Sequence, residues 1–253
     1  ILELDPKPLW SYFNDIALIP HPSKKEQKLA DFVVSFAKKH NLETHVDKTG
    51  NVLIRKPATK GMENRKCVIL QAHLDMVPQK NSDKKHDFEK DPIRTIVDGE
   101  WVRADGTTLG ADNGIGVAAI LSILASHNLQ HGPLEALLTI DEETGMTGAF
   151  GLKKGFLKGD ILMNLDSEDE GELYVGCAGG VDVSITRDYG TEKCPEGMIA
   201  FIINARGLKG GHSGVDIVLG RANSNKLMAR FLMQAEADFG IRLAEFEGGD
   251  LRN

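Results

Sequence analysis

Residues 67–77 read CVILQAHLDMV, and this stretch decides the fold that we expect. Its first six residues form an apolar run, which is typical of a strand covered on both faces of a sheet. The run is followed by His73 and Asp75, whose side chains suit chemistry more than packing. Two further apolar runs, at 134–140 and 161–165, also lead into carboxylates. Because ligands of open α/β sheets gather outside the carboxyl ends of the strands, we expect a site at this edge.

Helices and short strands are predicted around these three runs. The helices are expected at 6–19, 24–40 and 114–127, and the strands at 44–47 and 52–56. A capping box of Ser23 and Glu26 is predicted to begin the second helix. The third helix is apolar on nearly all sides, which indicates a buried element. The sequence therefore predicts an α/β domain with a central mixed, largely parallel sheet flanked by helices.

The pattern changes near Gly179 and Gly180. Beyond them we expect strands at 181–187 and 199–205, a helix at about 222–237 and a last strand from about 240. The apolar stripe of that helix predicts packing rather than a cofactor site. A unit of this size is too small for a full domain, so we expect part of a smaller α+β domain. The last strand is expected to be unfinished, as in a fragment.

Net charge, apolar run length and cysteine content indicate which kinds of partner and which cellular location to expect. The 253 residues include 30 Lys+Arg and 37 Asp+Glu, a net charge of −7, which argues against nucleic-acid binding and suits metal cations. Since no apolar run reaches 18 residues, we expect no membrane span and no membrane partner. The three cysteines are odd in number and lack metal-type spacing, which favours a reducing, cytoplasmic location.

His73 and Asp75 are the first candidate site residues. In a strand, side chains two residues apart point the same way and lie roughly 6–7 Å apart. His73 can therefore bind a metal through one ring nitrogen while Asp75 accepts the N–H of the other. The alternative is a His–Asp pair that satisfies itself at a strand end.

The remaining candidates are carboxylates. Asp112 lies at a helix start, where Asp is also a common N-cap, but its two oxygens can bridge two cations. Glu142 and Glu143 follow Asp141, and neighbouring side chains in an extended turn face different ways. One glutamate can therefore bind metal while the other reaches a water molecule. The alternative is a solvated acidic turn. Asp166 follows the run at 161–165.

A competing pattern lies in the third helix. GIGVAA at 114–119 fits the dinucleotide fingerprint G-x-G-x-x-A, but no hydrophobic strand precedes it. We therefore interpret these glycines as sites of close helix–sheet packing and rank a nicotinamide oxidoreductase last among the alternatives.

Five motifs carry a resemblance to a known family. They are IPHPS at 19–23, QAHLDMV at 71–77, LGADNG at 109–114, TIDEETG at 139–145 and NLD at 164–166. In this order and spacing, the sequence resembles the dinuclear zinc exopeptidases of the aminoacylase/carboxypeptidase-G type. The resemblance runs from Leu9 to the end of the chain.

The resemblance implies two zinc ions in a complete site. His73, Asp112 and Asp166 would surround one of them, and Asp112 would bridge to a second that Glu143 also binds. Carboxylate-rich sites accept Mn or Co as well, so the native metal stays open. The family pattern also implies a cis peptide bond between Asp112 and Asn113.

The resemblance also implies catalytic roles. Glu142 would be the general base, Asp75 the partner of His73, and His212, in GGHSG at 210–214, the residue that polarises the substrate carbonyl. The implied reaction is hydrolysis of dipeptides, of the Xaa-His (carnosine) type and other unblocked ones, by a metal-bridged water. Residues 1–183 would be the N-terminal part of the catalytic domain, and 184–253 the first part of a lid and dimerisation domain through which a homodimer forms.

One departure from the family pattern limits these expectations. The family's second zinc takes a further histidine from a C-terminal return of the catalytic domain, which this sequence does not contain. We therefore expect the chain to be incomplete and, by itself, inactive. The alternatives are a related amide hydrolase, either a deacylase or a tripeptide aminopeptidase, and a non-catalytic metal-binding or dimerising module.

Overall fold

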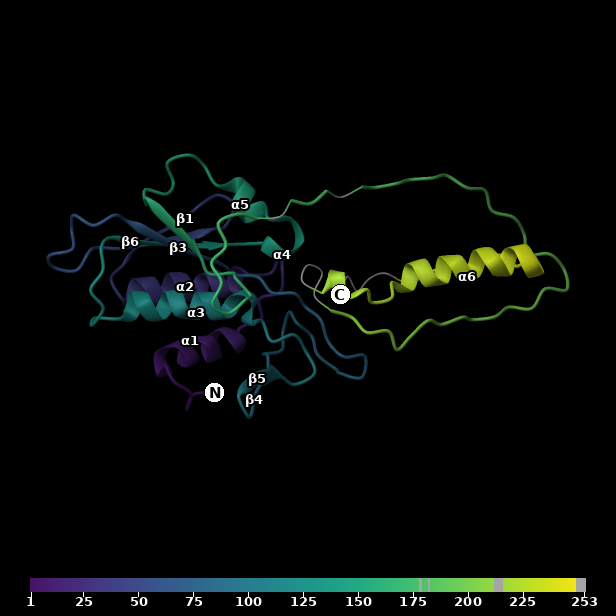
Figure 1. Ribbon diagram of the computed structural model, residues 1–253, viewed down its shortest axis with the longest axis horizontal. Helices are drawn as coiled ribbons and strands as arrows, with labels where there is room; N and C mark the ends of the chain where they lie inside the picture. Colours follow the sequence, from purple (N-terminus) through teal and green to yellow (C-terminus); the bar gives the residue numbers. More distant parts are fainter. Residues whose placement is uncertain (178, 182, 212–215, 249–253) are drawn as a thin grey trace. The chain divides into compact units, whose positions relative to one another are not determined.

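The computed structural model describes residues 1–177, 179–181, 183–211 and 216–248. Contacts between Cα atoms divide the chain after Cys177 into two compact units. The first unit holds a five-stranded sheet, and the second holds the long helix α6 (Ser224–Phe239). Helix α6 and some strands of the sheet are labelled in Figure 1.

The sheet of the first unit has the strand order β1-β2-β6-β3-β7. Its strands are β1 (Glu43–Val46), β2 (Val52–Lys56), β3 (Val68–His73), β6 (Leu134–Thr139) and β7 (Ile161–Asn164). Strand β3 is parallel to β6 and β7, whereas β2 is antiparallel to β1 and β6. The sheet is therefore mixed, which confirms the predicted α/β fold. The carboxyl ends of the three parallel strands meet at one edge.

Three helices lie on one side of this sheet (Figure 1): α2 (Gln27–Lys39) and α3 (Ala111–Ala125) directly against it, and α1 (Lys7–Ala17) outside α3. Helix α2 packs against β1 and β2, α3 packs against β3, and α1 packs on α3. The strand side chains that join them in one core are Val52, Ile54, Leu70, Ala72, Ala136 and Leu138. Each fully buried Leu or Ile of such a core stabilises the fold by about 1.5–3 kcal/mol.

Helix α3 is the most buried of the helices. Eight of its residues are buried because it lies between α1 and the sheet, which confirms the prediction of a buried helix. Its backbone leaves helical geometry at Asp112 and Asn113. In the described part of the chain, no helix combines the length and the apolar character needed to cross a membrane.

Two local predictions for the first unit are wrong or incomplete. The capping box is wrong: α2 begins at Gln27 without a side-chain cap, and the Ser23 hydroxyl donates to Asp75 instead. Tertiary partners have replaced the local ones. The hairpin of β4 (Thr95–Asp98) and β5 (Trp101–Ala104) was not predicted, although Asp-Gly between two β-rich runs is a strong hairpin signal. Two short helices, α4 (Glu142–Gly145) and α5 (Thr147–Gly151), follow β6.

The second unit confirms the predicted helix but not the predicted strands. It contains α6 and the short 3-10 helix η1 (Ile217–Leu219). The described residues within 181–187, 199–205 and 240–248 form no strand. The apolar side chains of 183–185 and 199–202 are exposed. A strand is stable only with a ladder partner, and none of these stretches has one among the described residues.

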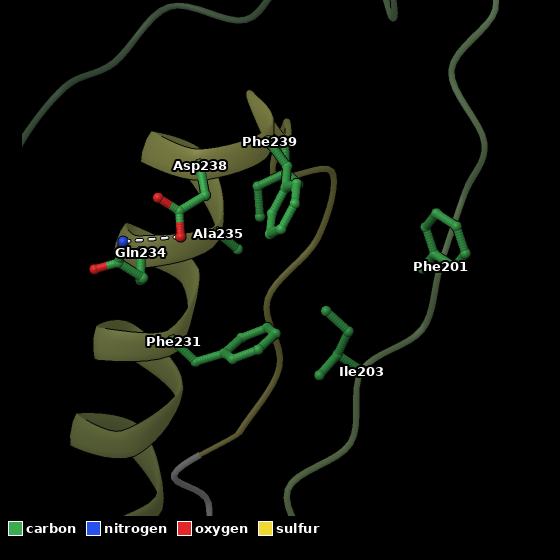
Figure 2. Close-up of a pocket in the computed structure, with 8 residues that line it drawn as sticks. Phe201, Ile203, Phe231, Gln234, Ala235, Asp238 and Phe239 are labelled. Carbon is green, nitrogen blue, oxygen red and sulfur yellow. Dashed lines mark hydrogen bonds between the residues drawn. The ribbon is translucent and has the colours of Figure 1, made fainter.

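An apolar cleft of about 460 Å³ lies in the second unit, between α6 and the segment of Phe201 and Ile203. Figure 2 shows Phe231 pointing from α6 toward Ile203. The polar lining is confined to Gln234, whose amide donates to Asp238 at 2.9 Å, and Asp238 itself. None of the described candidate site residues lines this cleft.

Candidate metal centre

The candidate residues gather at the carboxyl edge of the parallel strands. Strand β3 ends at His73, which is paired with Thr139 at the end of β6. Helix α4, with Glu142 and Glu143, follows β6 directly, and Asp166 lies just beyond the end of β7. Asp112 comes from the start of α3, and Asp75 from the segment after β3. Segments far apart in the sequence therefore place an imidazole and several carboxylates side by side.

The imidazole of His73 is the centre of this group and is only 1% exposed. Its Nε2 atom lies 2.9 Å from Oδ1 of Asp112 and 3.5 Å from Oδ1 of Asp166. Its Nδ1 atom lies 2.9 Å from the backbone oxygen of Asp75 and 3.3 Å from the Asp75 carboxylate. Burial alone would lower the pKa of His73, but hydrogen bonds with these three aspartates raise it to about 12.

Two sets of possible metal ligands share His73. One set is His73, Asp112 and Asp166, and the other is His73, Glu142 and Glu143. Within each set, the ligand atoms lie within 4.8 Å of one another. Donor atoms around a tetrahedral zinc ion stand roughly 3.4 Å apart, since each lies about 2.0–2.1 Å from the metal. Imidazole nitrogen and carboxylate oxygen are donors that zinc accepts, so both sets fit a divalent cation.

The two glutamates of α4 are half-buried and electrostatically crowded. The pKa of Glu143 is raised to about 7, first by burial and then by the negative charge of Asp112. Burial also raises the pKa of Glu142, and the carboxylates of Asp166, Asp75 and Asp112 add to this effect against the opposing charge of His73. Carboxylates crowded in this way gain from a cation that neutralises them.

Asp75 connects the two ligand sets. Its carboxylate is buried and accepts hydrogen bonds from the backbone N–H groups of Glu142 at 2.9 Å and Glu143 at 3.1 Å. The Ser23 hydroxyl donates to the same carboxylate at 2.8 Å. Burial alone would raise the pKa of Asp75, but hydrogen bonds with His73, the Glu142 N–H and Ser23 lower it to about 2. Asp75 therefore stays ionised beside both His73 and α4.

Three residues at the site were not predicted to act there: Ser23, Glu26 and Asn113. The Asn113 amide donates to the Leu165 backbone oxygen at 2.8 Å and to Oδ1 of Asp166 at 2.5 Å, and so fixes the position of Asp166. The peptide bond between Asp112 and Asn113 is cis, as the family resemblance implied. The motif IPHPS and the Asn of LGADNG were the available signals, but neither spacing nor residue type revealed these contacts.

His212 lies outside the described residues, so the structure gives no position for it. His21, although close to the site, is buried and bonded locally, with Nδ1 at 2.5 Å from the Ile19 backbone oxygen. The group that the structure brings together therefore consists of His73, Asp75, Asp112, Glu142, Glu143 and Asp166.

Comparison with known protein families shows which family this chain matches. The profile of peptidase family M20/M25/M40 matches residues 69–241, a range that includes this whole group. The chain belongs to this family.

Individual family members are similar over the whole chain. The cytosol non-specific dipeptidase of Escherichia coli (strain K12) is 56% identical over 251 residues, which cover 99% of this chain and 52% of that protein. The crystal structure of aminoacylhistidine dipeptidase from Vibrio alginolyticus has a TM-score of 0.70 and 56% identity, and the match covers 100% of this chain and 51% of that one. The chain thus spans about half the length of these M20 relatives.

A more distant match shows the fold alone. The aminopeptidase PepT structure from Bacillus cereus is 22% identical, with a TM-score of 0.56, and the match covers 64% of this chain and 44% of that one.

Proposed function

We propose that this chain carries the metal centre of a zinc-dependent dipeptidase that hydrolyses unblocked dipeptides, including those ending in histidine. The observation that carries the proposal is that His73, Asp112, Asp166 and the two glutamates of α4 converge at one edge of the sheet. The substrate class is supported by two relatives at 56% identity, one named a cytosol non-specific dipeptidase and the other an aminoacylhistidine dipeptidase.

The ligands divide between two cations in this proposal. His73 and Asp166 would hold one zinc ion, Glu143 would hold the other, and Asp112 would be shared by both. When bound, zinc acts as a Lewis acid: it polarises a carbonyl and lowers the pKa of a water molecule to about 7. Manganese or cobalt would accept the same donors.

The other residues position groups and move protons. Glu142 takes a proton from the attacking water on its carboxylate and returns it to the leaving amine, for which a pKa raised by burial is suited. Asp75 accepts the Nδ1–H of His73 and so orients the ring. His212, outside the described residues, is proposed to polarise the substrate carbonyl.

The surroundings of this centre are also proposals. Residues 1–183 form the N-terminal part of the catalytic domain, and residues 184–253 form the first part of a lid domain through which two copies pair. The division of the chain after Cys177 supports a boundary in this region. A cytoplasmic location is proposed because the E. coli relative is named a cytosol enzyme.

Zinc titration tests the metal centre without requiring turnover. Zinc is added to the metal-free 253-residue chain, and bound ions are counted by native mass spectrometry. His73→Ala and Asp166→Ala should each weaken binding by more than about tenfold. Glu100→Gln, which alters an exposed carboxylate in the turn of the β4–β5 hairpin, should bind zinc like the wild type. A wild-type chain without zinc affinity in the micromolar range would overturn the proposal.

Substrate class is tested separately, with the full-length protein. Dipeptides, tripeptides and N-acyl amino acids are compared at equal concentration with zinc present. We expect dipeptides to be hydrolysed fastest. Preference for N-acyl amino acids would indicate a deacylase, and preference for tripeptides an aminopeptidase.

A further inference from the structure

We infer that Ser23 and Glu26 are positioning residues that hold the two glutamates of α4 against His73. The inference rests on the proposed function, because it assumes that Glu142 and Glu143 serve the metal centre. Ser23 and Glu26 precede α2, and the sequence pattern assigned them to a helix cap. The structure uses both side chains for contacts with segments far away in the sequence.

The first turn of α4 is held in place through hydrogen bonds that its backbone N–H groups donate to other segments. The N–H groups at the start of a helix have no partner within the helix and must find one elsewhere. Here the Asp141 N–H donates to Oε1 of Glu26 at 3.0 Å. The next two N–H groups, of Glu142 and Glu143, donate to the two oxygens of Asp75. Three consecutive N–H groups are therefore bound by buried carboxylates from outside the turn.

The segment 23–26, which carries Ser23 and Glu26, is itself held by hydrogen bonds. Oε1 of Glu26 also accepts the N–H of Lys24 at 2.9 Å. The Ser23 hydroxyl donates to Asp75, and the Ser23 N–H donates to the Met76 backbone oxygen at 3.2 Å. Residues 23–26 thus connect the end of β3 to the start of α4. This connection couples the segment that follows His73 to the turn that carries the glutamates.

The turn needs such support because Asp141 is in the left-handed region, with φ 50° and ψ 46°. An unusual backbone conformation of this kind persists only when its surroundings hold it. The Asp141 carboxylate accepts hydrogen bonds from the hydroxyls of Thr144 and Thr147. Glu26 accepts the backbone N–H of the same residue, so hydrogen bonds restrain both the side chain and the backbone of Asp141.

The number of acceptor sites explains why carboxylates fill this role. Glu26, Asp75 and Asp141 are all at most 4% exposed, and their oxygens lie within 4.8 Å of one another. Each of them accepts at least two hydrogen bonds from backbone N–H groups or hydroxyls. A side-chain amide also offers an accepting oxygen, whereas an apolar side chain offers none. We therefore expect a neutral acceptor at position 26 to retain most of the effect and an apolar residue to lose it.

The experiment compares Glu26→Leu, Glu26→Gln and Ser23→Ala with a matched control, Glu135→Leu. Glu135 is also buried and also accepts two backbone N–H bonds, from Lys158 and Gly159. It lies near the opposite end of β6, and because it also pairs with Arg55 at 2.8 Å, its loss should cost at least as much stability as that of Glu26. The first measurement is hydrogen exchange of the amides at 141–143 in the metal-free chain. The second is zinc titration of the whole chain, read as the affinities of the first and second ions.

We expect amide exchange at 141–143 to accelerate in Glu26→Leu and to stay unchanged in the control. The second zinc ion, which depends on Glu143, should bind about tenfold more weakly in Glu26→Leu, while the first changes little. Glu26→Gln should restore most of this affinity, and Ser23→Ala, which loses one bond to Asp75, should show a smaller loss.

The outcomes separate this inference from the proposed function. If the wild type binds two zinc ions and Glu26→Leu binds both equally well, the inference is wrong and the proposed function stands. If the control weakens the second ion as much as Glu26→Leu does, Glu26 acts only through stability, and the inference is again wrong. If the wild type binds one zinc ion only, hydrogen exchange at 141–143 decides the inference, and unchanged exchange in Glu26→Leu would show it to be wrong. If the wild type binds no zinc, both fail. Should Glu26→Leu not fold, Glu26→Gln and Ser23→Ala decide by the same readouts.

Discussion

Glu142 and Glu143 are adjacent in the sequence and chemically identical, yet their surroundings differ. Burial is the first cause of the raised pKa of both, but the next negative influence on Glu143 is Asp112, whereas on Glu142 it is Asp166. Both N–H groups are fixed by Asp75, so the two carboxylates leave the backbone in set directions. The proposal that Glu142 is the base and Glu143 the metal ligand follows the family resemblance and remains to be tested.

The assignment predicts different results for two conservative changes. Glu142→Gln should lower dipeptide turnover in the full-length protein by about 10²–10⁴-fold, the usual contribution of a general base, with zinc content unchanged. Glu143→Gln should instead remove one of the two zinc ions. Turnover and metal content are measured on the same samples. Equal zinc loss in both variants would place Glu142 among the ligands.

Because His21 is buried, we expect it to make the free energy of unfolding depend on pH. Burial is the main cause that holds its pKa below the usual value for histidine. Below about pH 6.5 the unfolded chain therefore binds a proton that the folded chain does not, so stability rises with pH and is lost as pH falls through this range. Urea unfolding between about pH 5 and 8 should show a shallower slope for His21→Asn than for the wild type. Identical slopes would show that His21 does not contribute.

At the scale of elements, α3 approaches the segment after β7 closely at Gly116. A Cβ atom there would meet the Asn113 amide oxygen and, at 2.9 Å, the Leu165 backbone oxygen. At Gly114, it would meet the ring of Phe13 at 3.3 Å, a contact that a side chain can relieve. These contacts agree with the interpretation of the glycines as sites of close packing, not of cofactor binding.

The difference between the two glycines gives an element-scale prediction. Gly116→Ala should destabilise the fold by about 1–3 kcal/mol, the usual cost of overpacking, and should weaken zinc binding because Asn113 also holds Asp166. Gly114→Ala is the matched control and should cost less. Chemical denaturation and zinc titration check both changes. A larger effect at Gly114 would contradict the prediction.

The helices and strands also show which features local sequence patterns were sufficient to predict. The apolar runs that became β3 and β6, and the buried helix α3, were predictable because their burial requires apolar residues at nearly every position. The capping box was not reliable, because Ser23 and Glu26 have better partners in Asp75 and in the Asp141 N–H. Local sequence cannot reveal a competitor that lies 52 or 115 residues away.

At the scale of the whole molecule, the sheet has two edge strands in the described structure, β1 and β7, and β7 is the edge next to the candidate metal centre. Strand β7 pairs only with β3 there, and all four of its residues, including Ile161, Leu162 and Met163, are exposed. The chain covers 52% of its E. coli relative. The candidate metal centre therefore lies beside an apolar edge that the described residues leave open.

We expect the 253-residue chain to bind zinc but not to hydrolyse dipeptides. The full-length protein should be active under the same conditions. The measurement is zinc-dependent release of amino acids from an unblocked dipeptide at equal molar concentrations of the two proteins. Comparable hydrolysis by the shorter chain would show that its described ligands suffice for turnover.

The sequence by itself determined the type of fold and the five strands of the main sheet, and its family resemblance supplied the candidate ligands. The fold type and these strands depend on apolar periodicity, which is a local property. Only the tertiary structure decided that the candidate ligands gather around His73, that Asp75 bonds to both His73 and the start of α4, and that Ser23 and Glu26 bond to Asp75 and the Asp141 N–H. The physical reason is that such hydrogen bonds join backbone and side-chain groups of distant segments, whose meeting is set by the packing of the sheet and not by any nearby residue.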